Sequence, residues 1–260
     1  MDNTTTNIAV LIDGDNAQAK LMKEILEEVS KYGKATIRRI YGDWTIPQMS
    51  SWKNIVNEYS INPVQKFNYT VGKNSTDSAL IIDAMDILHS RNVEGFCIVS
   101  SDSDYTGLAK RIREEGLFVM GIGEKKTPNA FVQSCDIFTY TENLSNDKAN
   151  SHDYNLTNQK TGSDLQDADK KDSDLEQIKD SSGRPMPYQI IVDKAFQISA
   201  KDDDEALIST IGANIHKIDP SFDPRTYGFS NLTKLFESIK KYEVAKNVIN
   251  GLNYPIVRLK

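Results

Sequence analysis

Cysteine, histidine and long apolar runs are scarce in this chain of 260 residues, and each scarcity excludes a class of protein. The two cysteines, Cys97 and Cys135, stand in apolar contexts without the spacing of a zinc site, which favours buried free thiols in a reducing compartment. The N-terminal Met-Asp-Asn-Thr-Thr-Thr is not basic, and the apolar run after it is too short for a signal peptide core or a membrane span. We therefore expect a soluble, cytoplasmic protein.

Histidine-based and serine-based catalysis have little support in the sequence. His89, His152 and His216 are scattered, and the motif Gly-x-Ser-x-Gly is absent. The formal net charge of −6 gives no overall basic signature of nucleic-acid binding. The net charge does not exclude an RNA partner, because such binding depends on a local basic patch and not on the total charge.

Short apolar runs alternate with helical periodicity up to about Tyr140. Continuous apolar runs are typical of strands that are buried on both faces, and their alternation with helices predicts right-handed βαβ units. Residues 1–144 are therefore expected to form a three-layer α/β/α domain with a mainly parallel sheet. The expected strands are 8–12, 36–41, 64–67, 96–99, 118–122 and 137–140, and the expected helices are 17–32, 47–59, 76–90, 105–115 and 128–134.

Residues 145–183 interrupt this pattern with nine acidic and five basic side chains and few aromatic ones, which predicts a disordered, acidic and polar linker. Apolar periodicity resumes in residues 184–260, where 11 basic and nine acidic side chains give a net charge of +2. This region is the first place to look for phosphate contacts. We expect helices at 188–200, 206–216 and 231–241, then strands within 242–249 and 254–259 around an Asn-Gly turn, which together make a small winged-helix-like domain.

Acidic residues follow two of the expected strands and open one expected helix. Asp13 and Asp15 end the first apolar run, Asp102 and Asp104 end the run at 96–99, and Asp77 begins a helix. Ligands of open parallel sheets bind beyond the carboxyl ends of the strands, so these acids point to one site. Crowded carboxylates cannot all stay ionised without a cation, and the simplest occupant is a divalent metal with oxygen ligands.

Several of these acids also have a structural explanation. Asn16 caps the following helix or acts as a ligand through its amide, and Asp104 is a second candidate helix cap. Asp77 lies in a first helical turn, where the helix dipole favours an acid. An acid that ends a buried strand, such as Asp13, needs a partner, and this favours the metal site over capping alone. Asp83 and Asp86, farther along the same helix, are expected to face solvent or make structural contacts.

Four residues are candidates for contacting substrate, and for two of them we weigh a plainer alternative. Lys73 contacts a phosphate or is an ordinary surface lysine, and Trp44 stacks a base or packs between helix and sheet. The remaining two candidates are Asp15 and Ser101.

A pair of glycines at 121 and 123 hints at dinucleotide binding, but the third glycine of that motif is missing.

Three motifs in the N-terminal region together resemble the NYN domains of the LabA/limkain type, which are PIN-like, metal-dependent ribonuclease domains. Residues 12–16 read Ile-Asp-Gly-Asp-Asn, residues 72–77 hold Gly-Lys and then an aspartate, and residues 99–105 read Val-Ser-Ser-Asp-Ser-Asp-Tyr. The similarity covers about residues 7–142. It implies Mg²⁺ or Mn²⁺ held by Asp13, Asp77, Asp102 and Asp104, with Asn16 in support.

The C-terminal region resembles the OST-HTH/LOTUS domain, a winged-helix module associated with RNA or with protein partners. Residues 215–222 read Ile-His-Lys-Ile-Asp-Pro-Ser-Phe, and residues 227–232 read Tyr-Gly-Phe-Ser-Asn-Leu. The aromatic residues are most simply core. Lys234, Lys240 and Lys241 form a phosphate-facing edge or an ordinary solvated helix face.

Three functions follow from these patterns. The first is a metal-dependent endoribonuclease whose C-terminal domain recruits RNA or a protein partner. The second is a catalytically silent RNA-binding or scaffold protein, although surplus like charges destabilise a fold unless they bind something. The third is a haloacid-dehalogenase-type phosphatase with Asp13 as nucleophile, against which Asn16 stands where Thr or Val usually follows. Mg²⁺ and Mn²⁺ both suit oxygen ligands, and the apolar sides of the helices leave room for a homodimer interface.

Overall fold

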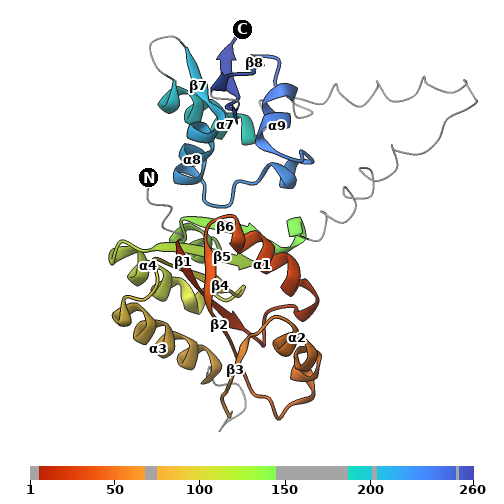
Figure 1. Cartoon of the computed structure of the whole chain (residues 1–260), viewed down its shortest axis with the longest axis vertical. Helices are drawn as coiled ribbons and strands as arrows, with labels where there is room; N and C mark the ends of the chain where they lie inside the picture. Colours follow the sequence, from red (N-terminus) through yellow and green to blue (C-terminus); the bar gives the residue numbers. More distant parts are fainter. Residues whose placement is uncertain (1–5, 68–74, 145–186, 201–203, 250–251) are drawn as a thin grey trace, which may run out of the picture. The chain divides into compact units, whose positions relative to one another are not determined.

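The computed structural model describes residues 6–67, 75–144, 187–200, 204–249 and 252–260. The chain divides into two compact units, Met1–Asp147 and Lys148–Lys260 (Figure 1). Within the described residues, no helix is both long and apolar enough to cross a membrane. Cys97 and Cys135 are buried and free, as the sequence predicts.

The first unit is built on a six-stranded sheet in which all neighbouring strands run parallel, which confirms the predicted α/β class. The strand order is β3-β2-β1-β4-β5-β6. The chain therefore begins in the middle of the sheet, adds β2 and β3 toward one edge, and then adds β4, β5 and β6 toward the other. The order reverses between β1 and β4, which is where open α/β sheets bind ligands. The strands are β1 (Asn7–Asp13), β2 (Lys34–Gly42), β3 (Asn62–Gln65), β4 (Gly95–Val99), β5 (Phe118–Gly123) and β6 (Ile137–Tyr140).

Helices cover both faces of this sheet, with α3 and α4 on one side and α1 and α2 on the other (Figure 1). Alternate residues of β1 serve the two layers, because Ala9 and Leu11 pack with the α3 and α4 side while Val10 and Ile12 pack with the α1 side. A strand buried on both faces needs an unbroken apolar run, and this explains the sequence of β1. The helices are α1 (Met22–Ser30), α2 (Lys53–Glu58), α3 (Ser75–Ser90), α4 (Thr106–Glu114) and α5 (Asn129–Ser134).

Two predicted helices begin with a 3-10 turn. The prediction at 17–32 corresponds to η1 (Ala19–Leu21) followed by α1, and the prediction at 47–59 corresponds to η2 (Pro47–Trp52) followed by α2. The predicted strand at 64–67 was placed two residues late, because β3 begins at Asn62 and includes Pro63. A proline in a strand is tolerated at the edge of a sheet, and β3 is an edge strand.

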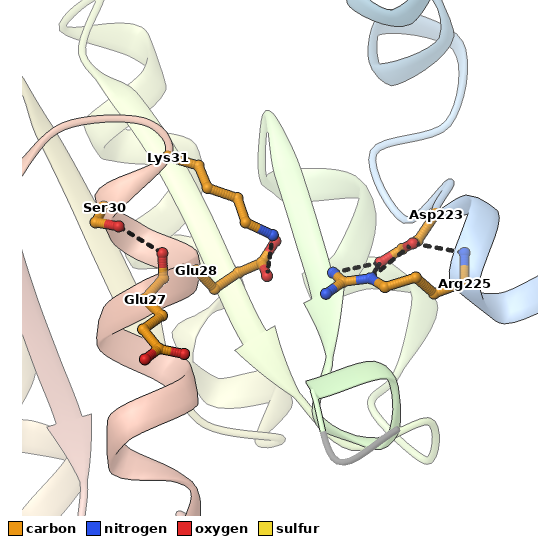
Figure 2. A network of polar contacts seen from close by, with 6 residues as sticks. All are labelled: Glu27, Glu28, Ser30, Lys31, Asp223 and Arg225. Carbon is orange, nitrogen blue, oxygen red and sulfur yellow. Dashed lines mark hydrogen bonds and ion pairs between the residues drawn. The ribbon is translucent and has the colours of Figure 1, made fainter. Parts of the chain in front are cut away.

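Two side-chain contacts lie at the C-terminal end of α1. Lys31 Nζ lies 2.7 Å from Glu28 Oε2, and the hydroxyl of Ser30 donates to the carbonyl of Glu27 at 2.6 Å (Figure 2). Glu28 is a buried acid, which needs a charged or hydrogen-bonding partner. The serine satisfies one of the carbonyls that a helix end leaves without an intrahelical donor.

The second unit packs three helices against a small antiparallel sheet of order β7-β11-β8. Its core holds Val192, Ile211, Leu235, Phe236 and Val257. The elements are α7 (Pro187–Ser199), β7 (Glu205–Leu207), α8 (Ile208–Ile218), η4 (Pro224–Tyr227), α9 (Leu232–Ser238), β8 (Tyr242–Ala245), β9 (Val248–Ile249), β10 (Leu252–Asn253) and β11 (Ile256–Leu259).

One sequence prediction in this unit was wrong at its start. The helix expected at 206–216 begins only at Ile208, because the residues before it form β7 and pair with β11. A three-residue strand is fixed by a distant partner, so local periodicity does not reveal it. Farther along the chain, Asp223 caps η4. Its carboxylate also forms an ion pair with the guanidinium of Arg225, in which Arg225 Nη2 lies 2.7 Å from Asp223 Oδ2 (Figure 2). The predicted linker and the Asn-Gly turn lie outside the described residues.

Candidate metal centre

Acidic side chains gather at the carboxyl edge of the sheet, where β1 and β4 end next to each other. Ile12 of β1 pairs with Val99 of β4, and the chain leaves these strands at Asp13 and Ser100. After β4 the chain enters the short helix η3 (Ser103–Tyr105), which packs against α3. The strand ends and this contact bring four separate acids to one edge of the molecule.

Asp77, Asp102 and Asp104 form a cluster, in which one carboxylate oxygen of each lies within 4.8 Å of the others. Asp77 and Asp102 are partly buried and Asp104 is exposed, so the cluster opens to solvent. Burial raises the pKa of Asp77 above its ordinary value, and the neighbouring acids Asp13, Asp102 and Asp104 raise it further. Closely spaced carboxylate oxygens are the ligands that Mg²⁺, Mn²⁺ and Ca²⁺ prefer, so the donor set fits a hard divalent cation.

Asp13 lies deeper than these three acids and is fully buried. Its Oδ2 accepts hydrogen bonds from the amide of Asn16 at 2.7 Å and the hydroxyl of Ser100 at 2.9 Å, and its Oδ1 accepts from the backbone N–H of Asp15 at 3.2 Å. Burial raises the pKa of Asp13, while the bonds from Asn16 and Ser100 oppose that rise. Asn16 thus supports the site by holding Asp13.

Ser100 connects the two strand ends. Its hydroxyl donates to Asp13 and accepts from the backbone N–H of Asp102 at 3.1 Å. The hydroxyl is therefore used in both directions, and it links the acid of β1 to the loop that carries Asp102. The sequence analysis quoted Ser100 within the motif at 99–105 but gave it no role, and its position directly after the apolar run of β4 was the available signal.

Tyr105 is a second residue to which the sequence analysis gave no role, although it ends the motif at 99–105. The side chain is fully buried, and its hydroxyl donates to Asp77 Oδ1 at 2.7 Å. Burial, together with the charges of Asp13 and Asp77, raises the pKa of this phenol far above its ordinary value. The group therefore keeps its proton and stays a hydrogen-bond donor. Its position directly after the Asp-Ser-Asp motif was the available signal.

Gly14 allows the loop after β1 to press against β2. Its backbone N–H donates to the carbonyl of Tyr41 at 2.9 Å, and a Cβ at this position would lie 2.7 Å from the same oxygen. Only glycine permits that approach without a shift of the backbone. The glycine in the Asp-Gly-Asp motif thus fixes the backbone that follows Asp13.

The candidate substrate contacts are less closely grouped than the acids. Asp15 is exposed, and Lys73 lies outside the described residues. The hydroxyl of Ser101 accepts from the backbone N–H of Glu124 at 2.9 Å, so it joins the loops after β4 and β5. The indole N–H of Trp44 donates to the carbonyl of Val64 at 3.3 Å, and the ring packs against the core on the α1 side.

Asp83 belongs to a different network, between α3 and β2. It accepts hydrogen bonds from the guanidinium of Arg39 and from the hydroxyl of Tyr41. This is one of the two alternatives that the sequence left for Asp83, which were a structural contact and a place facing solvent. The full burial of Asp13 also weighs against its use as a nucleophile in a phosphatase, because an attacking carboxylate must reach the phosphorus atom.

Comparison with known proteins gives two family matches and a few distant relatives. The NYN domain family matches residues 7–145, and the OST-HTH/LOTUS domain family matches residues 186–254. An uncharacterized protein of Methanocaldococcus jannaschii is 30% identical over 120 residues, and the match covers 45% of this chain and 47% of that protein. The chain thus spans about half the length of this relative.

Two solved structures show weaker likeness. A protein of unknown function from Vibrio parahaemolyticus has a TM-score of 0.45 and 18% identity, and the match covers 53% of this chain and 94% of that one. An uncharacterized protein from Nitrosomonas europaea has a TM-score of 0.26 and 20% identity, with 39% and 91% covered.

Proposed function

The chain belongs to the NYN domain family and carries an OST-HTH/LOTUS domain, and on this premise we propose that it is a metal-dependent endoribonuclease that hydrolyses RNA phosphodiester bonds. NYN domains are PIN-like nuclease domains, and the C-terminal match is to a domain type associated with RNA. The observation that carries the proposal is the convergence of Asp77, Asp102 and Asp104 within 4.8 Å at the carboxyl edge of the sheet.

Asp77, Asp102 and Asp104 would hold Mg²⁺ or Mn²⁺, with Asp13 as the fourth acid behind them. When bound, such a cation activates a water molecule and neutralises charge on the phosphodiester during an in-line displacement. Asp13 contributes negative potential, because its charge already raises the pKa of Asp77. Asn16 and Ser100 keep Asp13 oriented through hydrogen bonds. Because the attacking group is a water molecule, the protein needs to supply no basic nucleophile.

The acids also set a problem for substrate binding, because RNA is a polyanion and residues 1–144 carry 15 basic and 19 acidic side chains. We propose that the C-terminal unit recruits the RNA, or a protein that delivers it. Its lysines are partly paired, with Lys234 2.8 Å from Glu237 and Lys241 3.1 Å from Asp193. Exposed ion pairs are worth roughly 0–1 kcal/mol, so a phosphate can displace these acids at little cost. Lys240 is exposed beside Lys241.

The proposal is tested by cleavage of labelled single-stranded and structured RNA in EDTA, Mg²⁺ or Mn²⁺. Wild type is compared with Asp102→Asn, which removes one acid of the cluster, and with Asp86→Asn, which removes one exposed acid of α3 outside it. Both changes alter the net charge equally. We expect metal-dependent cleavage that Asp102→Asn abolishes and Asp86→Asn retains.

The second candidate is a catalytically silent RNA-binding or scaffold protein, and the OST-HTH/LOTUS match is the observation in its favour. It predicts RNA binding that is independent of metal, without turnover at any Mn²⁺ concentration. That result in the same assay would replace the nuclease proposal with this one. Cleavage that survives Asp102→Asn would instead overturn the assigned site.

A further inference from the structure

We infer that the hydroxyl of Tyr105 is the positioning group of the proposed metal centre, because it fixes the carboxylate of Asp77 in the direction of Asp102 and Asp104. The inference rests on the proposed function, since it concerns the same cluster, and it assigns the residue that sets the geometry of that cluster. Tyr105 itself is not a ligand, because its hydroxyl is fully buried and donates to Asp77 Oδ1 at 2.7 Å.

The hydroxyl is unnecessary for packing. The ring of Tyr105 belongs to the core between the sheet and α3, and its centroid lies 6.3 Å from that of Phe131. A phenylalanine would fill nearly the same space without carrying a polar group into the core. Burying a hydroxyl is costly unless it finds a hydrogen-bond partner, and the partner that it finds is Asp77.

The bond joins the two elements that supply the cluster. Tyr105 is the last residue of η3, which contains Asp104 and which Asp102 caps through a bond of 2.9 Å from the backbone N–H of Asp104. Asp77 lies in the first turn of α3, 28 residues away in sequence. A single hydrogen bond thus fixes Asp77 relative to the other two carboxylates.

The hydroxyl also acts against electrostatic repulsion. Asp77 is only partly buried, and two like charges lie within 4.8 Å of its carboxylate. Without a donor behind it, this side chain is free to rotate to another staggered conformation and turn toward water, which separates the charges. A metal would then have to restore the arrangement on binding, and the affinity would fall by the cost of doing so.

Loss of such an outer hydrogen bond typically weakens metal binding by about 10- to 100-fold. We therefore expect Tyr105→Phe to bind Mn²⁺ at least about tenfold more weakly than wild type. The measurement is isothermal titration calorimetry of the full-length protein with Mn²⁺ alone. Urea unfolding followed by fluorescence verifies that each variant is folded and gives its stability.

Tyr41→Phe is a matched control, because Tyr41 of β2 bonds to the same helix, α3. Tyr41 is also fully buried, and its hydroxyl also donates to an aspartate of α3, in this case Asp83, which is not part of the cluster. Both variants lose one tyrosine–aspartate bond to α3 and should lose comparable stability. Only Tyr105→Phe should weaken Mn²⁺ binding, while Tyr41→Phe should stay within about twofold of wild type, because surface and core changes away from a site rarely alter its ligands.

Equal Mn²⁺ affinity of Tyr105→Phe and wild type would overturn the inference, as would an equal loss in Tyr41→Phe. In an Asp77→Ala background, adding Tyr105→Phe should change Mn²⁺ affinity no further, since the side chain that the hydroxyl orients is gone. The binding assay is independent of RNA. A wild type that binds Mn²⁺ but cuts no RNA refutes the nuclease proposal alone, whereas a wild type that binds no Mn²⁺ refutes both.

Discussion

Neutralising Asp77 should make the metal-free protein more stable, although the residue belongs to the proposed site. Asp77→Asn removes one charge from a cluster whose carboxylate oxygens lie within 4.8 Å of one another. The asparagine keeps a side-chain oxygen that accepts the bond from the Tyr105 hydroxyl. The substitution therefore changes the charge and leaves the hydrogen-bond geometry intact.

The magnitude follows from Coulomb's law. At 4.8 Å, two unit charges repel by about 0.9 kcal/mol at the dielectric constant of water and by about 3.5 kcal/mol at an effective value of 20. Asp77 has two such neighbours, so relief of repulsion is worth at least about 2 kcal/mol. Loss of the favourable helix-dipole interaction in the first turn of α3 costs about 0.3–1 kcal/mol. Repulsion wins, and the expected net stabilisation is at least about 1 kcal/mol.

Urea unfolding in EDTA, followed by tryptophan fluorescence, is the suitable assay. Both tryptophans of the chain, Trp44 and Trp52, lie in the first unit, so their emission reports the unfolding of that unit alone. Saturating Mn²⁺ should reverse the order of stability. Wild type gains about 2.7 kcal/mol at a metal concentration 100 times Kd, whereas Asp77→Asn gains little.

Asp86→Asn is the control, because it removes an exposed charge from the same helix outside the cluster. Its stability should differ from wild type by no more than about 0.5 kcal/mol in either buffer. If Asp77→Asn is less stable than wild type in EDTA, the acids do not repel one another as the geometry requires. The reasoning behind the metal centre would then be refuted, because an uncrowded cluster needs no cation.

Two further predictions concern the same edge of the sheet. Ser100→Ala removes the hydroxyl that joins Asp13 to the loop of Asp102, and it should lower the free energy of unfolding in the fluorescence assay by roughly 1–3 kcal/mol; unchanged stability would contradict the buried bond. In EDTA the first unit should become more stable as the pH falls from the raised pKa values of Asp13 and Asp77 toward 3.8, since the folded state then binds protons more tightly than the unfolded one. Urea titrations across that pH range should show a smaller rise in Asp77→Asn, and an equal rise would show that Asp77 does not contribute.

Much of the first unit is predictable from its sequence because its physical causes are local. Unbroken apolar runs such as Ile8 to Ile12 are needed by strands that pack on both faces, and the alternation with helices favours a parallel sheet. Parallel strands bring their carboxyl ends to one edge, so acids after two runs are expected to be neighbours. The second unit was less predictable at β7, because pairing with β11 crosses about 50 residues of chain.

The sequence also determined which acids lie at the carboxyl edge, since Asp13, Asp77, Asp102 and Asp104 follow strands or open a helix. It did not determine which of these acids form the open cluster and which one is buried. Three of them form an open cluster, while Asp13 is buried behind them and held by Asn16. Burial depends on what the other elements cover, and no local pattern records that.

Tertiary structure alone decided which uncharged residues organise the site. Ser100 meets Asp13 across 87 residues, and Tyr105 meets Asp77 across 28. In the sequence these are an ordinary serine and an aromatic residue that reads as core, because a hydroxyl carries no pattern that names its partner. Apolar periodicity is a property of each segment by itself, whereas a hydrogen bond between segments exists only once packing has brought donor and acceptor within about 3 Å.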